Sequence, residues 1–313
     1  MTLARHSHVS PIIRSLVSFA SIFGWKCSNG KYLYWFHNHG GRSYEDRNPA
    51  WLCGGVETDS PAGKTIAWSE PEIALYDDDP RTRMSYPDLI EDSGRFFLTE
   101  TQKETARVHP IDRSLLEGLW SQADNRRAAT QGLVLDLPGA RGEIPQNTPM
   151  PPLPVLTTTG AGFAIDLWVT FDAISPGQVL LDSRTGSGQG MYFQTTSHSA
   201  VEVILNNGRS ESRWDCDPDL LHAGRSHHIV VNIDGGPKII TFLVDGRLCD
   251  GGETRQFGWG RFHPNLRDVN GAQMLRIGPG LSGRIHHLRI YDRYLRTSEA
   301  VGNYCVGLPG AGS

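Results

Sequence analysis

Cysteine is scarce in this chain, and its spacing excludes the sites that cysteine usually builds. Five cysteines are spread over 313 residues and none forms a C-x-x-C pair, so a structural zinc site is not expected. An odd number at such wide spacing is not a disulfide framework either. One bridge, between Cys216 and Cys249, stays open if the two residues lie on neighbouring strands.

Two further absences narrow the class of protein. The chain has 30 basic and 34 acidic side chains and a net charge of −4, which argues against a nucleic-acid-binding protein. It also has no apolar run of the roughly 18–20 residues that a membrane-spanning helix needs. We therefore expect neither nucleic acid nor a membrane span among its partners, and the oligomeric state stays open.

Glycine and proline are abundant, at 35 and 19 residues, while 38% of the chain is hydrophobic. This composition allows a packed core, and short apolar segments between many turns favour an all-β chain. The length indicates about two domains.

The amino terminus carries Arg5 and Arg14 before an apolar stretch at 16–25. This order is typical of a secretory signal, although no small-x-small cleavage site follows it. The alternative interpretations of this segment are a β-strand or a start codon wrongly assigned within a longer gene. We expect a secreted or cell-surface protein.

The chain divides near residues 121–130 in this interpretation. Residues 29–101 read as strands and turns, with a hairpin signal at Asn29-Gly30. Residues 111–128 look helical or irregular, and the strand at 131–137 is assigned to the second part. We predict domains at 1–120 and 131–308.

From Gly162 onward, apolar residues alternate with polar ones, and turn pairs such as Asn207-Gly208 and Asp245-Gly246 separate short strands. Period-2 alternation with frequent turns predicts a two-sheet sandwich.

Residues 131–308 resemble the laminin-G-like, concanavalin-A-like jelly-roll family. The resemblance rests on ordered motifs at 162–168, 221–231, 242–246 and 288–295. It implies a domain that binds glycans or other proteins, and some members hold calcium.

Calcium is the one cofactor that the second half suggests, and no other is expected. The alternate spacing of Asp215, Asp217 and Asp219 could supply oxygen ligands, although a solvated acidic loop is the simpler interpretation. We interpret His227-His228 as one core-facing and one exposed histidine on a strand, not as metal ligands.

Residues 29–110 resemble the last blades of a sialidase-like β-propeller. Trp68-Ser-Glu-Pro71 is similar to a blade-closing motif, and 59–68 resembles a degenerate Asp box. The segment 85–89 followed by Glu100 is similar to the family's nucleophile segment, and Arg47 stands where a third substrate-binding arginine is expected.

The resemblance implies catalytic roles for Tyr86, Glu100 and Arg47. Tyr86 would be the nucleophile, Glu100 would hold an arginine, and Arg47 would bind the substrate's carboxylate. An arginine binds a carboxylate bidentately, and a neutral tyrosine avoids the repulsion that a carboxylate nucleophile would meet there. The alternatives are a packed aromatic for Tyr86 and a surface salt bridge for Arg47.

Four further residues are candidates for substrate binding. His37 and His39 share one face of an extended segment, and Arg107 and His109 follow the Glu100 strand.

The family's acid/base Asp and two earlier arginines have no counterpart in a recognisable motif here. Residues 1–120 could also build only about two blades, whereas propellers close with about four to eight. The sequence therefore predicts the carboxy-terminal part of a sialidase-like glycoside hydrolase, catalytically incomplete, with an attached glycan-binding jelly roll. The alternative is a non-enzymatic glycan- or protein-binding adhesion protein.

Overall fold

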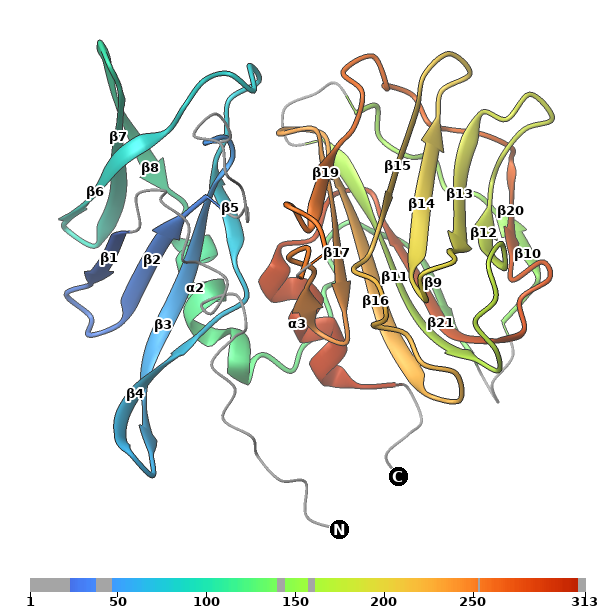
Figure 1. Cartoon of the computed structure of the whole chain (residues 1–313), viewed down its shortest axis with the longest axis horizontal. Coiled ribbons are helices and arrows are strands. Elements are labelled where there is room, and N and C mark those ends of the chain that lie inside the picture. The colour runs from blue at the N-terminus through green and yellow to red at the C-terminus, as the bar shows by residue number, and fades with distance from the viewer. Residues whose placement is uncertain (1–22, 38–46, 140–143, 157–160, 253, 309–313) are drawn as a thin grey trace. The chain divides into compact units, whose positions relative to one another are not determined.

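A computed structural model describes residues 23–37, 47–139, 144–156, 161–252 and 254–308 (Figure 1). The chain divides into two compact units, residues 1–125 and 126–313. Their hydrophobic cores are built from separate sets of residues. None of the described helices is long and apolar enough to cross a membrane.

Unit 1 contains two antiparallel sheets and a helix. Strands β1 to β4 are neighbours in chain order in the first sheet, where β5 pairs with β3, and β6 to β8 form the second. The elements are β1 (Phe23–Lys26), β2 (Tyr32–Phe36), β3 (Ala50–Ser60), β4 (Gly63–Trp68), β5 (Glu72–Leu75), β6 (Ser85–Asp92), β7 (Arg95–Gln102), β8 (Thr105–Ile111), α2 (Arg113–Ser121) and the 3₁₀ turn η1 (Gln122–Asp124).

Several expectations for unit 1 are confirmed. The turn at Asn29-Gly30 joins β1 to β2, and Gly30 has the positive φ, 79°, that such a turn requires. The helix α2 begins where Asp112 accepts a hydrogen bond from the Ser114 N–H at 2.9 Å. It lies directly on β3, because a Cβ on Gly54 would come within 2.8 Å of the Leu119 Cβ.

No propeller is present among the described residues of unit 1. Most strands in its two sheets pair antiparallel with the next strand in the chain, as in a propeller blade. One five-stranded and one three-stranded sheet do not, however, form the ring of blades that closes a propeller. The coarser expectation of an all-β architecture is confirmed.

Unit 2 is a sandwich of a six-stranded and a seven-stranded antiparallel sheet. The order is β10-β20-β12-β13-β14-β15 in the first and β18-β17-β16-β11-β21-β9 in the second, with β19 also against β17. The strands are β9 (Leu133–Pro138), β10 (Asn147–Pro149), β11 (Gly162–Phe171), β12 (Val179–Asp182), β13 (Gly190–Thr195), β14 (Val201–Asn206), β15 (Glu211–Asp215), β16 (Ser226–Asp234), β17 (Ile239–Val244), β18 (Arg247–Leu248), β19 (Trp259–Arg261), β20 (Met274–Ile277) and β21 (Gly283–Tyr291).

The alternation read from the sequence fills the space between these two sheets. Phe163, Ile165 and Leu167 on β11 are fully or almost fully buried in the core, together with Phe193 and Val203 from the opposite sheet. The strand expected at 131–137 is β9, which pairs with β21.

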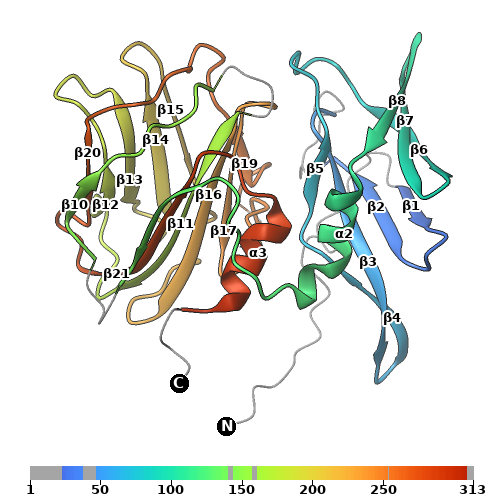
Figure 2. The same cartoon turned by 180° about the vertical axis from the view of Figure 1, so that it is seen from behind.

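Helix α3 (Thr297–Val306) covers the outer face of the seven-stranded sheet (Figures 1 and 2). The Tyr304 ring stacks on Trp168, with centroids 5.9 Å apart, and lies 5.8 Å from His228. His228 is therefore fully buried, and the expectation of an exposed histidine there was wrong. Strand alternation fixed its face, but the sequence pattern did not show that a helix returns to cover it.

The disulfide bridge considered between Cys216 and Cys249 is not formed in the structure. Cys216 and Cys249 are both buried free thiols. Burial raises the pKa of Cys216 to about 12 and that of Cys249 well above its usual value.

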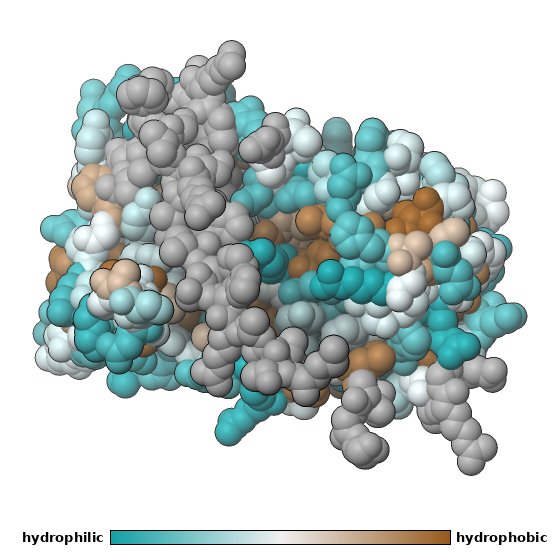
Figure 3. Space-filling model, turned by 60° about the horizontal axis from the view of Figure 1, so that its bottom comes forward, coloured by the Kyte–Doolittle hydropathy of each residue, from teal (hydrophilic) through white to brown (hydrophobic). Residues whose placement is uncertain are grey.

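Figure 3 shows one face of the molecule, on which hydrophobic residues gather in small groups between polar ones. Scattered exposed apolar residues are normal for a folded protein and do not by themselves mark an interface.

Candidate functional site

Unit 1 has a pocket of about 430 Å³ whose described walls carry cationic and neutral side chains and no carboxylate. This volume lies within the usual range for small-molecule sites. The lining residues are Arg47, Arg81, Arg83, Ser85, Tyr86, Thr101, Gln102 and Lys103. The pocket therefore suits a small anion.

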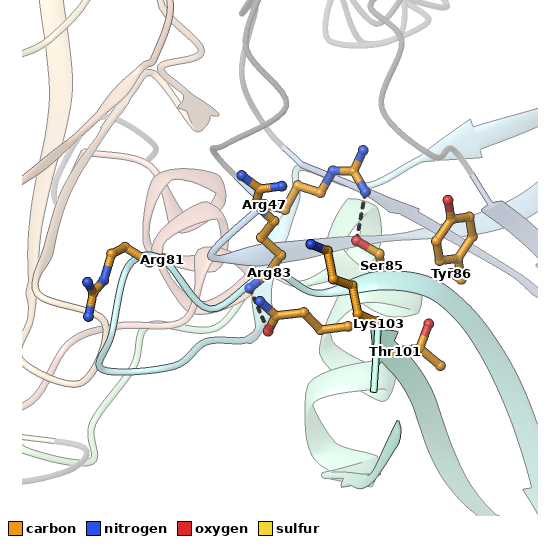
Figure 4. A pocket seen from close by; sticks show the side chains of 8 residues that line it. Arg47, Arg81, Arg83, Ser85, Tyr86, Thr101 and Lys103 are labelled. Carbon is orange, nitrogen blue, oxygen red and sulfur yellow. Dashed lines mark hydrogen bonds between the residues drawn. The ribbon is translucent and has the colours of Figure 1, made fainter. Parts of the chain in front are cut away.

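The four cations of the pocket are not equivalent. Arg47 precedes β3 and donates from Nη1 to the Ser85 Oγ at 2.8 Å, which holds it beside β6. Figure 4 shows the ends of Arg47, Arg83 and Lys103 around Ser85, whereas Arg81 lies apart. Arg81 is paired with Asp79, from Nη2 to Oδ2 at 2.9 Å. Arg47, Arg83 and Lys103 therefore form the cationic wall around Ser85.

Tyr86 is presented by an irregularity in β6. Its φ is 49°, in the left-handed region, and the pairing of β6 with β7 shifts register between Ser85 and Asp88. A bulky residue rarely adopts this conformation, and such strain tends to occur at functional sites. The side chain of Tyr86 is 67% exposed. The alternative of a packed strand aromatic is wrong, because the bulge turns this ring out to solvent.

Glu100, the third predicted catalytic residue, lies apart from Arg47 and Tyr86. Successive side chains of a strand point to opposite faces, so Glu100 faces away from Thr101, which lines the pocket. Its Oε1 accepts from the Arg107 Nη1 at 2.7 Å and lies 3.1 Å from the His109 Nε2. Among the described residues, Oε2 is buried with no hydrogen-bond partner.

The structure thus brings two of the three predicted catalytic residues together. Arg47 and Tyr86 share the pocket, and Glu100 belongs to a separate buried cluster. Arg107 and His109, expected in the cleft, are the partners of Glu100 instead, because β8 pairs with β7 in a register that places Arg107 opposite Glu100.

The two amino-terminal histidine candidates fall outside this arrangement. His37 is buried after β2, and its ring lies edge-on to Trp35 with centroids 5.9 Å apart. His39 lies outside the described residues.

The three calcium candidates do not offer a set of free oxygens. Arg255 donates to the Asp215 Oδ1 at 2.6 Å and to the Asp217 Oδ1 at 2.9 Å, and Asp217 also accepts the backbone N–H groups of Asp250 and Gly251. Asp219 is exposed. In the part of the chain that the structure describes, no three His, Cys, Asp or Glu side chains converge to hold a metal ion.

Sequence reasoning missed Arg83 and Lys103, which complete the cationic pocket. Both belong to turns or strand ends that carry no recognisable motif, and they meet Arg47 only because β6 and β7 pair. The only signal in the sequence was the close spacing of Arg81 and Arg83 just before the predicted strand.

In unit 2, two face-to-face antiparallel sheets with a covering helix define the concanavalin-A-like class of jelly-roll sandwich. Residues 146–301 match the concanavalin A-like lectin/glucanases superfamily. The chain therefore contains a concanavalin A-like lectin or laminin G domain at these positions.

Solved structures give distant similarities at the level of the fold. A Ruminococcus gnavus IT-sialidase CBM40 bound to alpha2,6 sialyllactose is 14% identical, with 55% of this chain and 100% of that chain covered and a TM-score of 0.39. A Trypanosoma rangeli sialidase is 12% identical, with a TM-score of 0.36, and the match covers 91% of this chain and 61% of the sialidase. A heptameric SAP-like pentraxin from Limulus polyphemus is 16% identical, covers 53% and 78%, and has a TM-score of 0.37. No curated protein matches the sequence.

Proposed function

We propose that this chain recognises acidic glycans and that unit 1 is a sialidase-like remnant that binds the carboxylate of a sugar. The observation that supports this is the pocket in which Arg47, Arg83 and Lys103 lie around Ser85 and Tyr86 lines the same wall, with no carboxylate among the described lining residues. An arginine binds a carboxylate through two parallel hydrogen bonds, and a wall without acids does not repel it.

Tyr86 occupies the position of the nucleophile in this proposal, but this chain by itself does not hydrolyse sialosides. A tyrosine nucleophile needs a base and the leaving group needs an acid. The one carboxylate that the sequence suggested for this neighbourhood, Glu100, faces away and is held by Arg107. General acid–base assistance contributes about 10²–10⁴-fold to rate, so its loss leaves binding without useful turnover.

The test is the binding of N-acetylneuraminic acid by the full chain, measured calorimetrically. We expect Arg47→Ala to weaken binding about tenfold or more, because a hydrogen bond to a charged group is lost. Arg95→Ala removes an exposed arginine that is paired with Asp92 outside the pocket and should leave affinity unchanged. If Arg47→Ala and Arg95→Ala bind the acid equally well, unit 1 does not hold the carboxylate.

Turnover is measured separately with a fluorogenic sialoside. We expect no hydrolysis above background by the full chain, and no difference between the native chain and Tyr86→Phe. Clear hydrolysis that Tyr86→Phe abolishes would show that this chain supplies its own acid and base.

The alternative function is that of a non-enzymatic adhesion protein, in which only the lectin-like domain at 146–301 binds glycans or other proteins. A secreted or cell-surface location is part of both proposals. Retention of all glycan binding by a chain that carries Arg47→Ala would favour this alternative.

A further inference from the structure

The pocket of unit 1 gathers more positive charge than one carboxylate balances. Arg47, Arg83 and Lys103 lie around Ser85 (Figure 4), and no carboxylate occurs among the described lining residues. A carboxylate carries a single negative charge on two oxygens that lie in one plane. A sugar acid bound there therefore leaves part of the cationic wall unbalanced.

Hydrogen bonds tie together the three segments that carry these cations. The Met84 N–H donates to the Arg47 carbonyl oxygen at 3.2 Å, which joins the Arg47 segment to the start of β6. The Arg83 N–H donates to the Gln102 Oε1 at 3.2 Å, next to Lys103 in the chain. The backbones of the three cations are thus held in place before any ligand binds, which lowers the entropy lost on binding.

Lys103 belongs to the tight turn between β7 and β8. Gln102 pairs with Thr105, so only Lys103 and Glu104 form the turn. The φ of Lys103 is 49°, in the left-handed region that two-residue hairpin turns of this kind require. The turn therefore fixes the backbone of Lys103 at the edge of the pocket.

Two hydroxyl groups add uncharged donors to this wall. Ser85 and Thr101 lie opposite each other on β6 and β7, and both line the pocket. The Ser85 Oγ accepts from the Arg47 Nη1 at 2.8 Å, so its own proton is available to a ligand. Three cations and two hydroxyls together suit a group that is rich in acceptor oxygens.

A phosphate monoester matches this wall better than a carboxylate does. It carries a charge of about −1.5 to −2 near pH 7 and has three strong acceptor oxygens. Those oxygens point in three directions, and Arg47, Arg83 and Lys103 come from three different segments of the chain. Arginine binds phosphate through paired N–H donors, and lysine binds it as a point charge.

We propose that this pocket binds the phosphate monoester of a phosphorylated sugar, and that it binds this group more tightly than a sugar carboxylate. The proposal rests on the proposed function, in which the same pocket takes an acidic sugar, and it names a further acid group. The ring of Tyr86, on the same wall and 67% exposed, offers the sugar an apolar surface.

The experiment is calorimetric titration of the full chain at pH 7.5 with glucose 6-phosphate, glucuronic acid and glucose. The three ligands share one ring and differ only at carbon 6. We expect glucose 6-phosphate to bind at least tenfold more tightly than glucuronic acid, and glucose not to bind measurably. Inorganic phosphate is the fourth titrant and should bind more weakly than glucose 6-phosphate. Equal binding of these two would overturn the part of the sugar.

The same titrations at pH 5 separate the two acid groups. The second ionisation of a phosphate monoester has a pKa of about 6, so most of the ligand loses one charge, and we expect its affinity to fall about tenfold. A carboxylate of ordinary pKa, about 4, stays ionised, and the affinity for glucuronic acid should hardly change. The described lining contains no histidine and no carboxylate, so this difference comes from the ligand.

Lys103→Ala and Arg83→Ala should each weaken the binding of glucose 6-phosphate tenfold or more. The matched controls are Arg95→Ala and Lys64→Ala, since Lys64 on β4 forms an exposed pair with Asp59 at 2.8 Å and neither control residue lines the pocket. Thermal midpoints check that all variants are folded. Unchanged binding of glucose 6-phosphate by folded Lys103→Ala, or equal affinity for glucose 6-phosphate and glucuronic acid at pH 7.5, overturns the proposal.

This proposal and the proposed function can fail separately. Arg47-dependent binding of N-acetylneuraminic acid without a preference for glucose 6-phosphate overturns the phosphate site and leaves the carboxylate site standing. Lys103-dependent binding of glucose 6-phosphate without binding of N-acetylneuraminic acid supports the phosphate site and overturns the carboxylate assignment.

Discussion

Glu100 places a fully buried carboxylate beneath two side chains that reach solvent. Arg107 and His109 are each 29% exposed, and both bind the same oxygen of Glu100. Burying a carboxylate costs free energy, which its partners recover only while they remain in place.

We therefore predict that Glu100→Gln lowers the free energy of unfolding of unit 1 by about 2 kcal/mol. Glu117→Gln is the matched control, because Glu117 forms an exposed pair with Arg113 at 2.8 Å on α2. Such pairs contribute only about 0.3–0.5 kcal/mol. Urea unfolding followed by tryptophan fluorescence measures both, and equal losses in the two variants would contradict the prediction.

At the scale of elements, α3 is joined to the seven-stranded sheet by a buried polar cluster. The Asn303 Nδ2 donates to the Asp166 Oδ2 at 2.6 Å, and its Oδ1 accepts the Ala129 N–H at 2.7 Å. Burial alone would raise the pKa of Asp166, but the charge and hydrogen bond of His228, with Arg289 and Asn303, lower it. Helix α3 thus supplies a hydrogen bond to the buried carboxylate of Asp166.

Removing Asn303 should loosen α3 from the sheet. Asn303→Ala leaves a buried carboxylate oxygen of Asp166 and the part-buried N–H of Ala129 without this partner, and we expect a loss of about 2–3 kcal/mol. Val306→Ala, on the same helix but 46% exposed, should change stability by less than about 0.5 kcal/mol. Hydrogen exchange in residues 297–306 provides the local measurement, and unchanged protection in Asn303→Ala would refute the role of this cluster.

At the scale of the whole molecule, each unit has its own core. The cluster of unit 2 runs from Leu153 to Ile290, and that of unit 1 from Cys27 to Trp120. A domain with a self-contained core folds independently. We predict that residues 126–313 expressed alone are folded, while the Arg47-dependent binding of N-acetylneuraminic acid is lost. Circular dichroism and calorimetry test this, and an unfolded fragment would contradict it.

The alternating pattern of unit 2 was readable from the sequence because each strand repeats its own signal every second residue. Turn pairs such as Asn207-Gly208 marked where the strands end, and the positive φ of Gly208, 83°, shows the physical basis of that signal. The helix α2 could also be predicted from the sequence, because its apolar residues recur at helical spacing. Period and turn chemistry are local, so a single sequence carries them.

What only the tertiary structure decided is which residues meet across strands. Arg47 reaches Ser85, and Glu100 binds Arg107 and faces away from Tyr86. None of these partners follows from a motif, because strand register and sheet order determine them, and shifting a register by one residue would send every side chain to the opposite face. The sequence by itself determined the strands and the kinds of side chain available, whereas the pairing of strands decided which of those side chains form a site.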